Sequence, residues 1–181
     1  MKFIIKILIL FVITTFHINS YANKWFISSG NYHSSKYSSL DQVNQNNINN
    51  LKEAWIYENG FKPPKEKNRY ANNQATPIFT GKNLIVSSLD NSLIALNPET
   101  GEENWRLKLD GYLLARRGFT YHEGNIFVPS SNGIYIVNEV SGKLNTELGK
   151  NGLIGSELRN LTLVPPIIHN NKIYTIFLMF I

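Results

Sequence analysis

The chain has 181 residues, a formal net charge of +5 and no cysteine. This length is enough for one ordinary domain with its core, and a hydrophobic content of 43% argues against a disordered protein. Without cysteine there is no disulfide, no thiolate metal site, no covalently attached c-type haem and no lipid on an N-terminal cysteine. No cluster of lysine and arginine rises above what a solvated surface carries, which argues against nucleic acid as a partner.

Residues 1–22 have the layout of a secretory signal peptide. Two lysines precede an apolar run over residues 7–16, and residues 20–22 form a small-x-small cleavage site. An uncleaved N-terminal anchor is the alternative, but the run is short for a membrane span. Cleavage would remove both lysines and lower the formal charge from +5 to +3. We therefore expect a periplasmic bacterial protein, exported by a cleavable signal peptide, with no integral membrane span in the mature chain.

Residues 23–72 form a polar N-terminal segment and linker. The Asn-rich residues 40–55 have apolar side chains spaced for one or two short helical turns, and they lead into a predicted strand at residues 53–58. Residues 59–70 contain one glycine, two prolines and five charged side chains, which is typical of a loop.

Residues 73–181 consist of short β runs separated by tight turns. Four strands are predicted at residues 76–80, 83–88, 92–97 and 104–109, and four more at 118–122, 125–129, 134–138 and 143–147. A third copy of this plan starts near Val164, where Pro166 stands near the place of Pro77.

The turns of the first two copies recur at a fixed offset of 41 residues. Residues 95–97 align with residues 136–138, and Thr100-Gly101 aligns with Ser141-Gly142. A period of about forty residues with four strands per unit is the signature of a β-propeller blade. A β-sandwich with irregular meanders would explain the strands but not the offset. We predict an all-β propeller, of which this chain holds two blades and the start of a third.

The stretch "ALNPETGEENW" at residues 95–105 suggests how one blade closes. The Asn97 side chain can cap the turn, and Gly101 supplies a positive φ. Trp105 then begins the outermost strand, where its flat ring can dock onto a neighbouring blade. Thr146 stands at the tryptophan position of the second copy, so this dock is degenerate or lost there.

These residues resemble the pyrroloquinoline quinone (PQQ) dependent dehydrogenases, quinoproteins that fold as eight-bladed propellers. Residues 95–105 are similar to the family's tryptophan-docking motif, residues 29–60 to its N-terminal segment, and residues 73–105 to its first complete blade. Residues 115–152, with "RRGFTYHEG", are most like the membrane-type quinoprotein glucose dehydrogenases. The resemblance implies an oxidoreductase with PQQ and Ca²⁺ on the propeller axis, which oxidises a sugar or alcohol and passes electrons to a quinone or cytochrome.

The resemblance also implies two cofactor-binding residues. Arg117 falls at the family's arginine that reaches the quinone oxygens, a role that suits a permanently charged, planar fork of donors. Without the resemblance Arg117 would be a surface arginine in a loop, and Arg116 its solvated neighbour. Gln74 stands where alcohol-oxidising members carry a glutamate that contacts the cofactor. Tyr121 and His122 are assigned no chemistry.

Two departures from the family limit the functional prediction. The vicinal cysteine pair of alcohol-oxidising members is absent, which favours the glucose-dehydrogenase-like branch. The catalytic aspartate and the Ca²⁺ ligands are expected beyond Ile181, so no catalytic or metal residue is assigned. We expect an N-terminal fragment that is inactive alone. The alternatives are a non-enzymatic propeller scaffold that binds partner proteins in the bacterial envelope, and a decayed fragment without activity.

Overall fold

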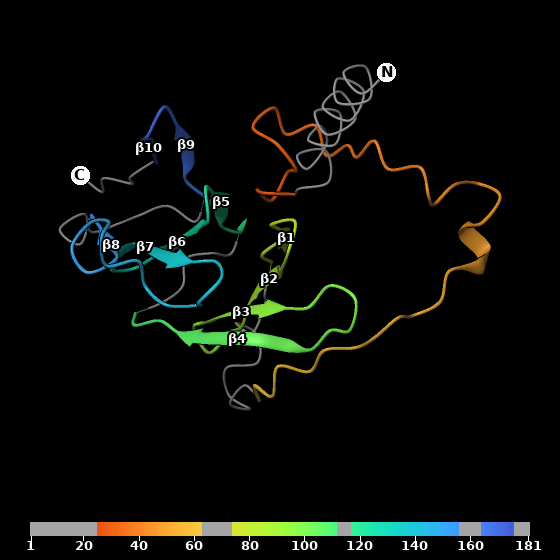
Figure 1. Ribbon diagram of the computed structural model, residues 1–181, viewed down its shortest axis with the longest axis horizontal. Coiled ribbons are helices and arrows are strands. Elements are labelled where there is room, and N and C mark those ends of the chain that lie inside the picture. The colour runs from red at the N-terminus through yellow and green to blue at the C-terminus, as the bar shows by residue number, and fades with distance from the viewer. Residues whose placement is uncertain (1–24, 63–73, 112–116, 156–163, 176–181) are drawn as a thin grey trace, which may run out of the picture.

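The computed structural model describes residues 25–62, 74–111, 117–155 and 164–175 (Figure 1). The predicted signal peptide and Arg116 lie outside the described residues. In the described part of the chain, no helix is long and apolar enough to cross a membrane.

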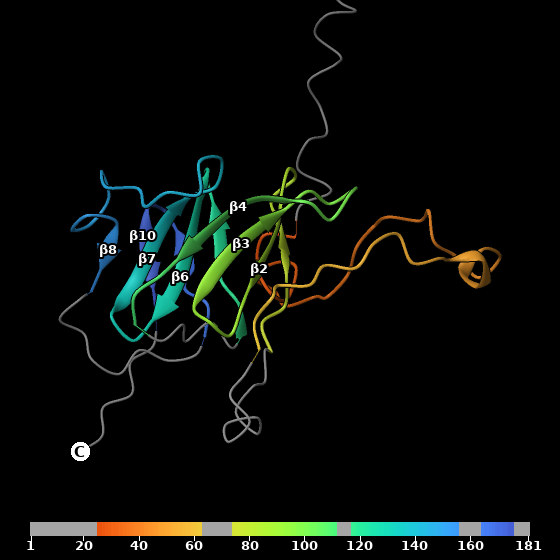
Figure 2. The ribbon, with the colours of Figure 1, turned by 90° about the horizontal axis from the view of Figure 1, so that it is seen from below.

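The described strands form two complete four-stranded units and the beginning of a third (Figures 1 and 2). The first sheet contains β1 (Ile78–Phe79), β2 (Leu84–Ser87), β3 (Ser92–Leu96) and β4 (Glu103–Lys108). The second contains β5 (Thr120–His122), β6 (Asn125–Ser130), β7 (Gly133–Asn138) and β8 (Leu153–Ile154), and a two-stranded sheet contains β9 (Ile167–His169) and β10 (Lys172–Tyr174). All neighbouring strands are antiparallel and follow chain order. The predicted all-β architecture is confirmed.

The turn between β3 and β4 has the predicted construction. The Asn97 side-chain Oδ1 accepts hydrogen bonds from the backbone N–H of Glu99 at 2.8 Å and of Thr100 at 3.2 Å. Gly101 has φ +74°, and its N–H donates to the backbone oxygen of Asn97 at 2.9 Å. Asn138 and Gly142 repeat the arrangement 41 residues later, since the Asn138 Oδ1 accepts two backbone N–H bonds and Gly142 has φ +66°.

Two predicted strands differ in the structure. Residues 143–147 do not form the fourth strand of the second unit: Leu144 makes a single bridge to Val137, and β8 pairs with β7 instead. The reason is a series of turns between them, with positive φ at Gly149, Asn151 and Gly152. Residues 53–58 have no ladder partner among the described residues. The predicted helical turns reduce to one 3-10 turn, η1 (Ile48–Asn50).

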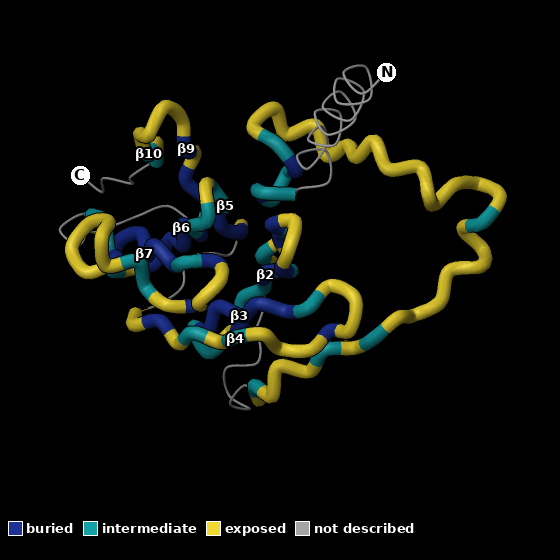
Figure 3. Tube along the Cα trace, viewed as in Figure 1, coloured by how far each residue is buried: buried dark blue, intermediate teal, exposed yellow. Residues whose placement is uncertain are grey.

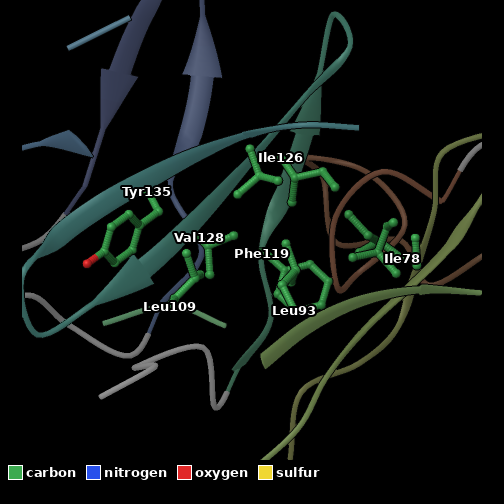
Figure 4. Close-up of a cluster of buried hydrophobic side chains, with 10 residues drawn as sticks. Ile78, Leu93, Leu109, Phe119, Ile126, Val128 and Tyr135 are labelled. Carbon is green, nitrogen blue, oxygen red and sulfur yellow. The ribbon is translucent and has the colours of Figure 1, made fainter. Parts of the chain in front are cut away.

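One hydrophobic core joins the first two sheets face to face (Figure 4). The first sheet contributes Ile78 and Leu93, and the second contributes Ile126 and Val128. Phe119 lies between them and is fully buried. A sheet with apolar side chains on both faces can bury each face against a neighbouring sheet, as the blades of a propeller do.

Polar contacts around Glu139, which directly follows β7, join it to the turn between β1 and β2. Glu139 is only 4% exposed. Its Oε1 accepts hydrogen bonds from Thr80 Oγ1 at 2.8 Å and from Asn83 Nδ2 at 2.6 Å. Asn104 Nδ2 donates to Asn83 Oδ1 at 2.7 Å, which links β4 to the same network. Two donors thus share one oxygen of the buried Glu139 carboxyl group.

The N-terminal residues enter between the first strands of the two sheets. Trp25 and Phe79 exchange two backbone hydrogen bonds of 2.9 Å, and Phe26 O accepts from Tyr121 N at 2.8 Å. Beyond Tyr32 the chain leaves as an extended arm, which we define as residues 33–62. Figure 1 shows the arm looping out from the sheets and returning beside β4, and Figure 3 shows that it is mostly exposed.

Candidate functional site

The beginnings of the first strands of successive units lie next to each other. A methyl group at Gly118, just before β5, would lie 3.5 Å from the backbone oxygen of Thr76, just before β1. Thr120, the first residue of β5, donates its hydroxyl to the backbone oxygen of Pro166, just before β9. These close approaches bring the residues that precede β1, β5 and β9 together at one end of the three units.

Both predicted cofactor-binding residues lie at this end. Gln74 is exposed two residues before Thr76, and Arg117 is exposed immediately before Gly118. Gly118 is buried with φ +104°, and a methyl group there would lie 3.3 Å from Ser28 Cβ. A larger residue at 118 would therefore be strained and crowded, so the glycine fixes the backbone that carries Arg117.

The chemistry of this pair fits an anionic, oxygen-rich ring system. A guanidinium presents a planar fork of charged donors, and an amide can both donate and accept. Within the described residues, neither side chain makes a hydrogen bond or ion pair with the protein, so their polar groups face solvent. No group of three or more His, Cys, Asp or Glu in the described part of the chain is placed to hold a metal ion.

A cavity of about 610 Å³ lies at the opposite end of the strands and was not anticipated from the sequence. It is lined by Phe26 and Tyr32 of the N-terminal segment and by the turns that follow β5 and β9. Tyr32 ties these parts together, since its hydroxyl donates to Ile168 O at 2.8 Å and accepts from Ile168 N at 3.3 Å. His122 lines this cavity, with Nε2 3.8 Å from Glu123 Oε2, and so belongs to the end away from Arg117. No sequence signal connects turns from separate repeats.

Comparison with known proteins supports the β-propeller fold. The family described as "Glucose/ethanol/alcohol dehydrogenase, beta-propeller domain" matches residues 25–169. Quinoprotein glucose dehydrogenase A of Acinetobacter calcoaceticus is 32% identical over 148 residues, which are 66% of this chain and 18% of that protein. Quinoprotein glucose dehydrogenase of Escherichia coli (strain K12) is 29% identical over 153 residues, covering 72% of this chain and 19% of that protein.

Among solved structures, quinohemoprotein alcohol dehydrogenase from Comamonas testosteroni superimposes with a TM-score of 0.61 and 23% identity. The match covers 83% of this chain and 22% of that one, and at this identity it shows the fold alone. The chain thus spans about a fifth of the length of the relatives it matches.

Proposed function

Because the chain belongs to the β-propeller family of the PQQ-dependent glucose, ethanol and alcohol dehydrogenases, we propose that it is the N-terminal part of a periplasmic dehydrogenase that oxidises a sugar or alcohol. PQQ, when bound, would accept the hydride from the substrate. The electrons would leave to a quinone or cytochrome acceptor. Export by residues 1–22 is part of the same proposal.

We propose that Arg117 and Gln74 contact the cofactor. The observation that carries this assignment is that both exposed donors stand at one end of adjacent units, where the backbone at Gly118 closely approaches Thr76. Arg117 would hold an oxygen-bearing edge of the cofactor with a charge that does not titrate, and Gln74 would add one neutral donor. The described residues supply no metal-ligand group, so Ca²⁺ would need ligands from elsewhere. Residues 23–181 alone are therefore expected not to bind PQQ with Ca²⁺ at micromolar concentrations.

The test uses a chimaera in which this chain replaces the matched segment of the A. calcoaceticus enzyme. PQQ affinity is measured by titration in the presence of Ca²⁺. Arg117→Ala should weaken binding by about tenfold or more, since charged hydrogen bonds contribute about 1.5–3 kcal/mol, and Gln74→Ala should have a smaller effect. Lys82→Ala is the matched control, because it removes one positive charge at the exposed turn between β1 and β2. Wild-type affinity in the Arg117→Ala chimaera would overturn the assignment.

A further inference from the structure

The returning end of the arm is fixed on the first sheet. The Trp55 ring lies over Gly101, since a methyl group at this glycine would lie 2.5 Å from the ring atom Cδ2. The Trp55 Nε1–H also donates to the backbone oxygen of Pro98 at 3.2 Å. Trp55 thus holds the residues that follow it in the arm close to the first sheet.

A polar clasp of Tyr57, Glu103 and Arg106 holds the next residues of the arm on β4. The Tyr57 hydroxyl donates to Glu103 Oε2 at 2.6 Å and accepts from an Arg106 guanidinium N–H at 2.7 Å. Burial, followed by the Glu103 carboxylate, raises the pKa of Tyr57 to about 12, so its hydroxyl keeps its proton at neutral pH. Arg106 forms a 2.9 Å ion pair with Glu103 and donates to the backbone oxygen of Asn59 at 3.4 Å. Asn59 is therefore held through its backbone, while the residue is exposed.

Asn59 combines an Asx turn with a following glycine. Its Oδ1 accepts a hydrogen bond from the Phe61 N–H at 2.8 Å, which folds the side-chain amide back toward Gly60. Gly60 is exposed with φ +73°, and an added methyl group there would have no atom within 4 Å. Its N–H has no hydrogen-bond partner among the described residues. The turn thus brings the side-chain carbonyl carbon toward an unshielded backbone nitrogen.

We propose that Asn59 is a site of spontaneous deamidation. The Gly60 nitrogen bonds to Asn59 Cγ and gives up its proton, the Cγ–Nδ2 bond breaks, and ammonia leaves with a proton. Water then opens the cyclic imide to aspartate or isoaspartate, and no oxidant or reductant is required. The Phe61 N–H stabilises the negative charge that Oδ1 gains in the tetrahedral intermediate, as an oxyanion-hole donor does. This inference does not rest on PQQ.

The modification adds a negative charge beside the clasp. Because Arg106 already reaches the backbone of Asn59, the new carboxylate arises next to the guanidinium that pairs with Glu103. Two carboxylates then compete for one cation. In the isoaspartate product the main chain is also one carbon longer between the clasp and Phe61. Deamidation therefore alters the contact that holds the arm on β4.

The sequence contains two more Asn-Gly pairs, which serve as internal controls. At Asn132–Gly133 the glycine is buried, and a methyl group there would collide with the backbone oxygen of Ile154. At Asn151–Gly152 the glycine N–H donates to Leu148 O at 3.1 Å. Ring closure at either pair must first disturb the fold, whereas ring closure at Asn59 needs no such change.

The test incubates the full 181-residue chain in mildly alkaline buffer, with and without urea. Peptide mapping by mass spectrometry follows deamidation at the three pairs, and labelling with an isoaspartate methyltransferase identifies the product. In the folded chain Asn59 should react at least as fast as in urea, and at least about tenfold faster than Asn132 and Asn151. In urea the three rates should converge, because the structural differences between the pairs are lost.

Two proline variants isolate the role of the Asx turn. Phe61→Pro removes the N–H that donates to Asn59 Oδ1, and should slow deamidation about tenfold in the folded chain only, since a hydrogen bond to a charged group contributes about 1.5–3 kcal/mol. Lys62→Pro is the matched control, because it moves the proline by one exposed position and keeps that donor. The proposal is overturned if Asn59 reacts more slowly in the folded chain than in urea, if all three pairs react equally when folded, or if both variants have the same rate.

Discussion

The interface between the first two sheets and the contact between the arm and the first sheet share one element, a tryptophan ring over a glycine. Between the sheets, Trp105 on Gly142 is surrounded by the hydrophobic core and by the buried Glu139 network. At the arm, Trp55 on Gly101 has only the partly exposed clasp of Tyr57, Glu103 and Arg106 beside it. The same side-chain contact thus serves as part of a core in one region and as a surface anchor in the other.

The largest loss of stability should come from truncating the hydrophobic core between the two sheets, since the arm has no comparable core. Phe119→Ala deletes a fully buried ring between the two sheets, and should lower the free energy of unfolding by about 3–5 kcal/mol. Urea denaturation followed by far-UV circular dichroism measures this loss. Ile56→Ala in the arm, at a side chain that is 71% exposed, should change it by less than about 0.5 kcal/mol. Equal losses in the two variants would contradict the contrast between the two regions.

The two docking glycines allow the same substitution in both regions. Gly142→Ala and Gly101→Ala each place a methyl group 2.5 Å from an indole, at φ +66° and +74°. Gly142→Ala should cost about 2–4 kcal/mol, because the left-handed strain adds to disruption of a packed interface. Gly101→Ala should cost only about 1–2 kcal/mol, because the arm can move away and leave mainly the backbone strain. Thermal unfolding compares them, and a larger cost at Gly101 would show that the arm is the stronger interface.

The buried carboxylate between the sheets should tolerate loss of charge better than loss of its oxygen. Glu139→Gln keeps an acceptor for Thr80 and Asn83, so a change below about 1 kcal/mol is expected. Glu139→Ala leaves both donors buried without their acceptor and should cost about 1–3 kcal/mol. Denaturant unfolding of both variants gives the difference. If Glu139→Gln were the more harmful change, the charge rather than the hydrogen bonding would stabilise the interface.

The sequence predicted the features that depend on neighbouring residues. The Asn97 turn, the positive φ of Gly101 and the docking of Trp105 follow from spacing within one repeat, and all three are confirmed. The predicted strand at 143–147 was wrong, because a series of turns follows Gly142 and the strand that pairs with β7 is β8.

Contacts between segments far apart in the sequence could not be predicted from residue spacing within one repeat. Trp55 meets Gly101 across 46 positions of sequence, and the cavity near His122 is lined by turns of separate units. Neither arrangement follows from a local pattern, because each depends on how whole sheets stack. Arg117 and Gln74 remain predictions: their proximity to one end of the units supports a cofactor role, and the affinity measurements in the chimaera test it.

The smallest expected effect is release of the arm by acid. Hydrogen bonds from Arg106 and Tyr57 lower the pKa of Glu103, so the carboxylate is favoured in the clasped state. A lowered pKa in the folded state gives stability that is present above the ordinary glutamate pKa and is lost as the pH falls through the lowered value. Because the clasp is largely exposed, its contribution should be at most about 0.5 kcal/mol. Fluorescence from Trp55, measured in a Trp25→Phe/Trp105→Phe background, should therefore report a shallow transition below pH 4.5 that Glu103→Gln abolishes. A transition that persists in Glu103→Gln would mean that a different group releases the arm, and that the polar clasp does not distinguish this contact from the interface between the sheets.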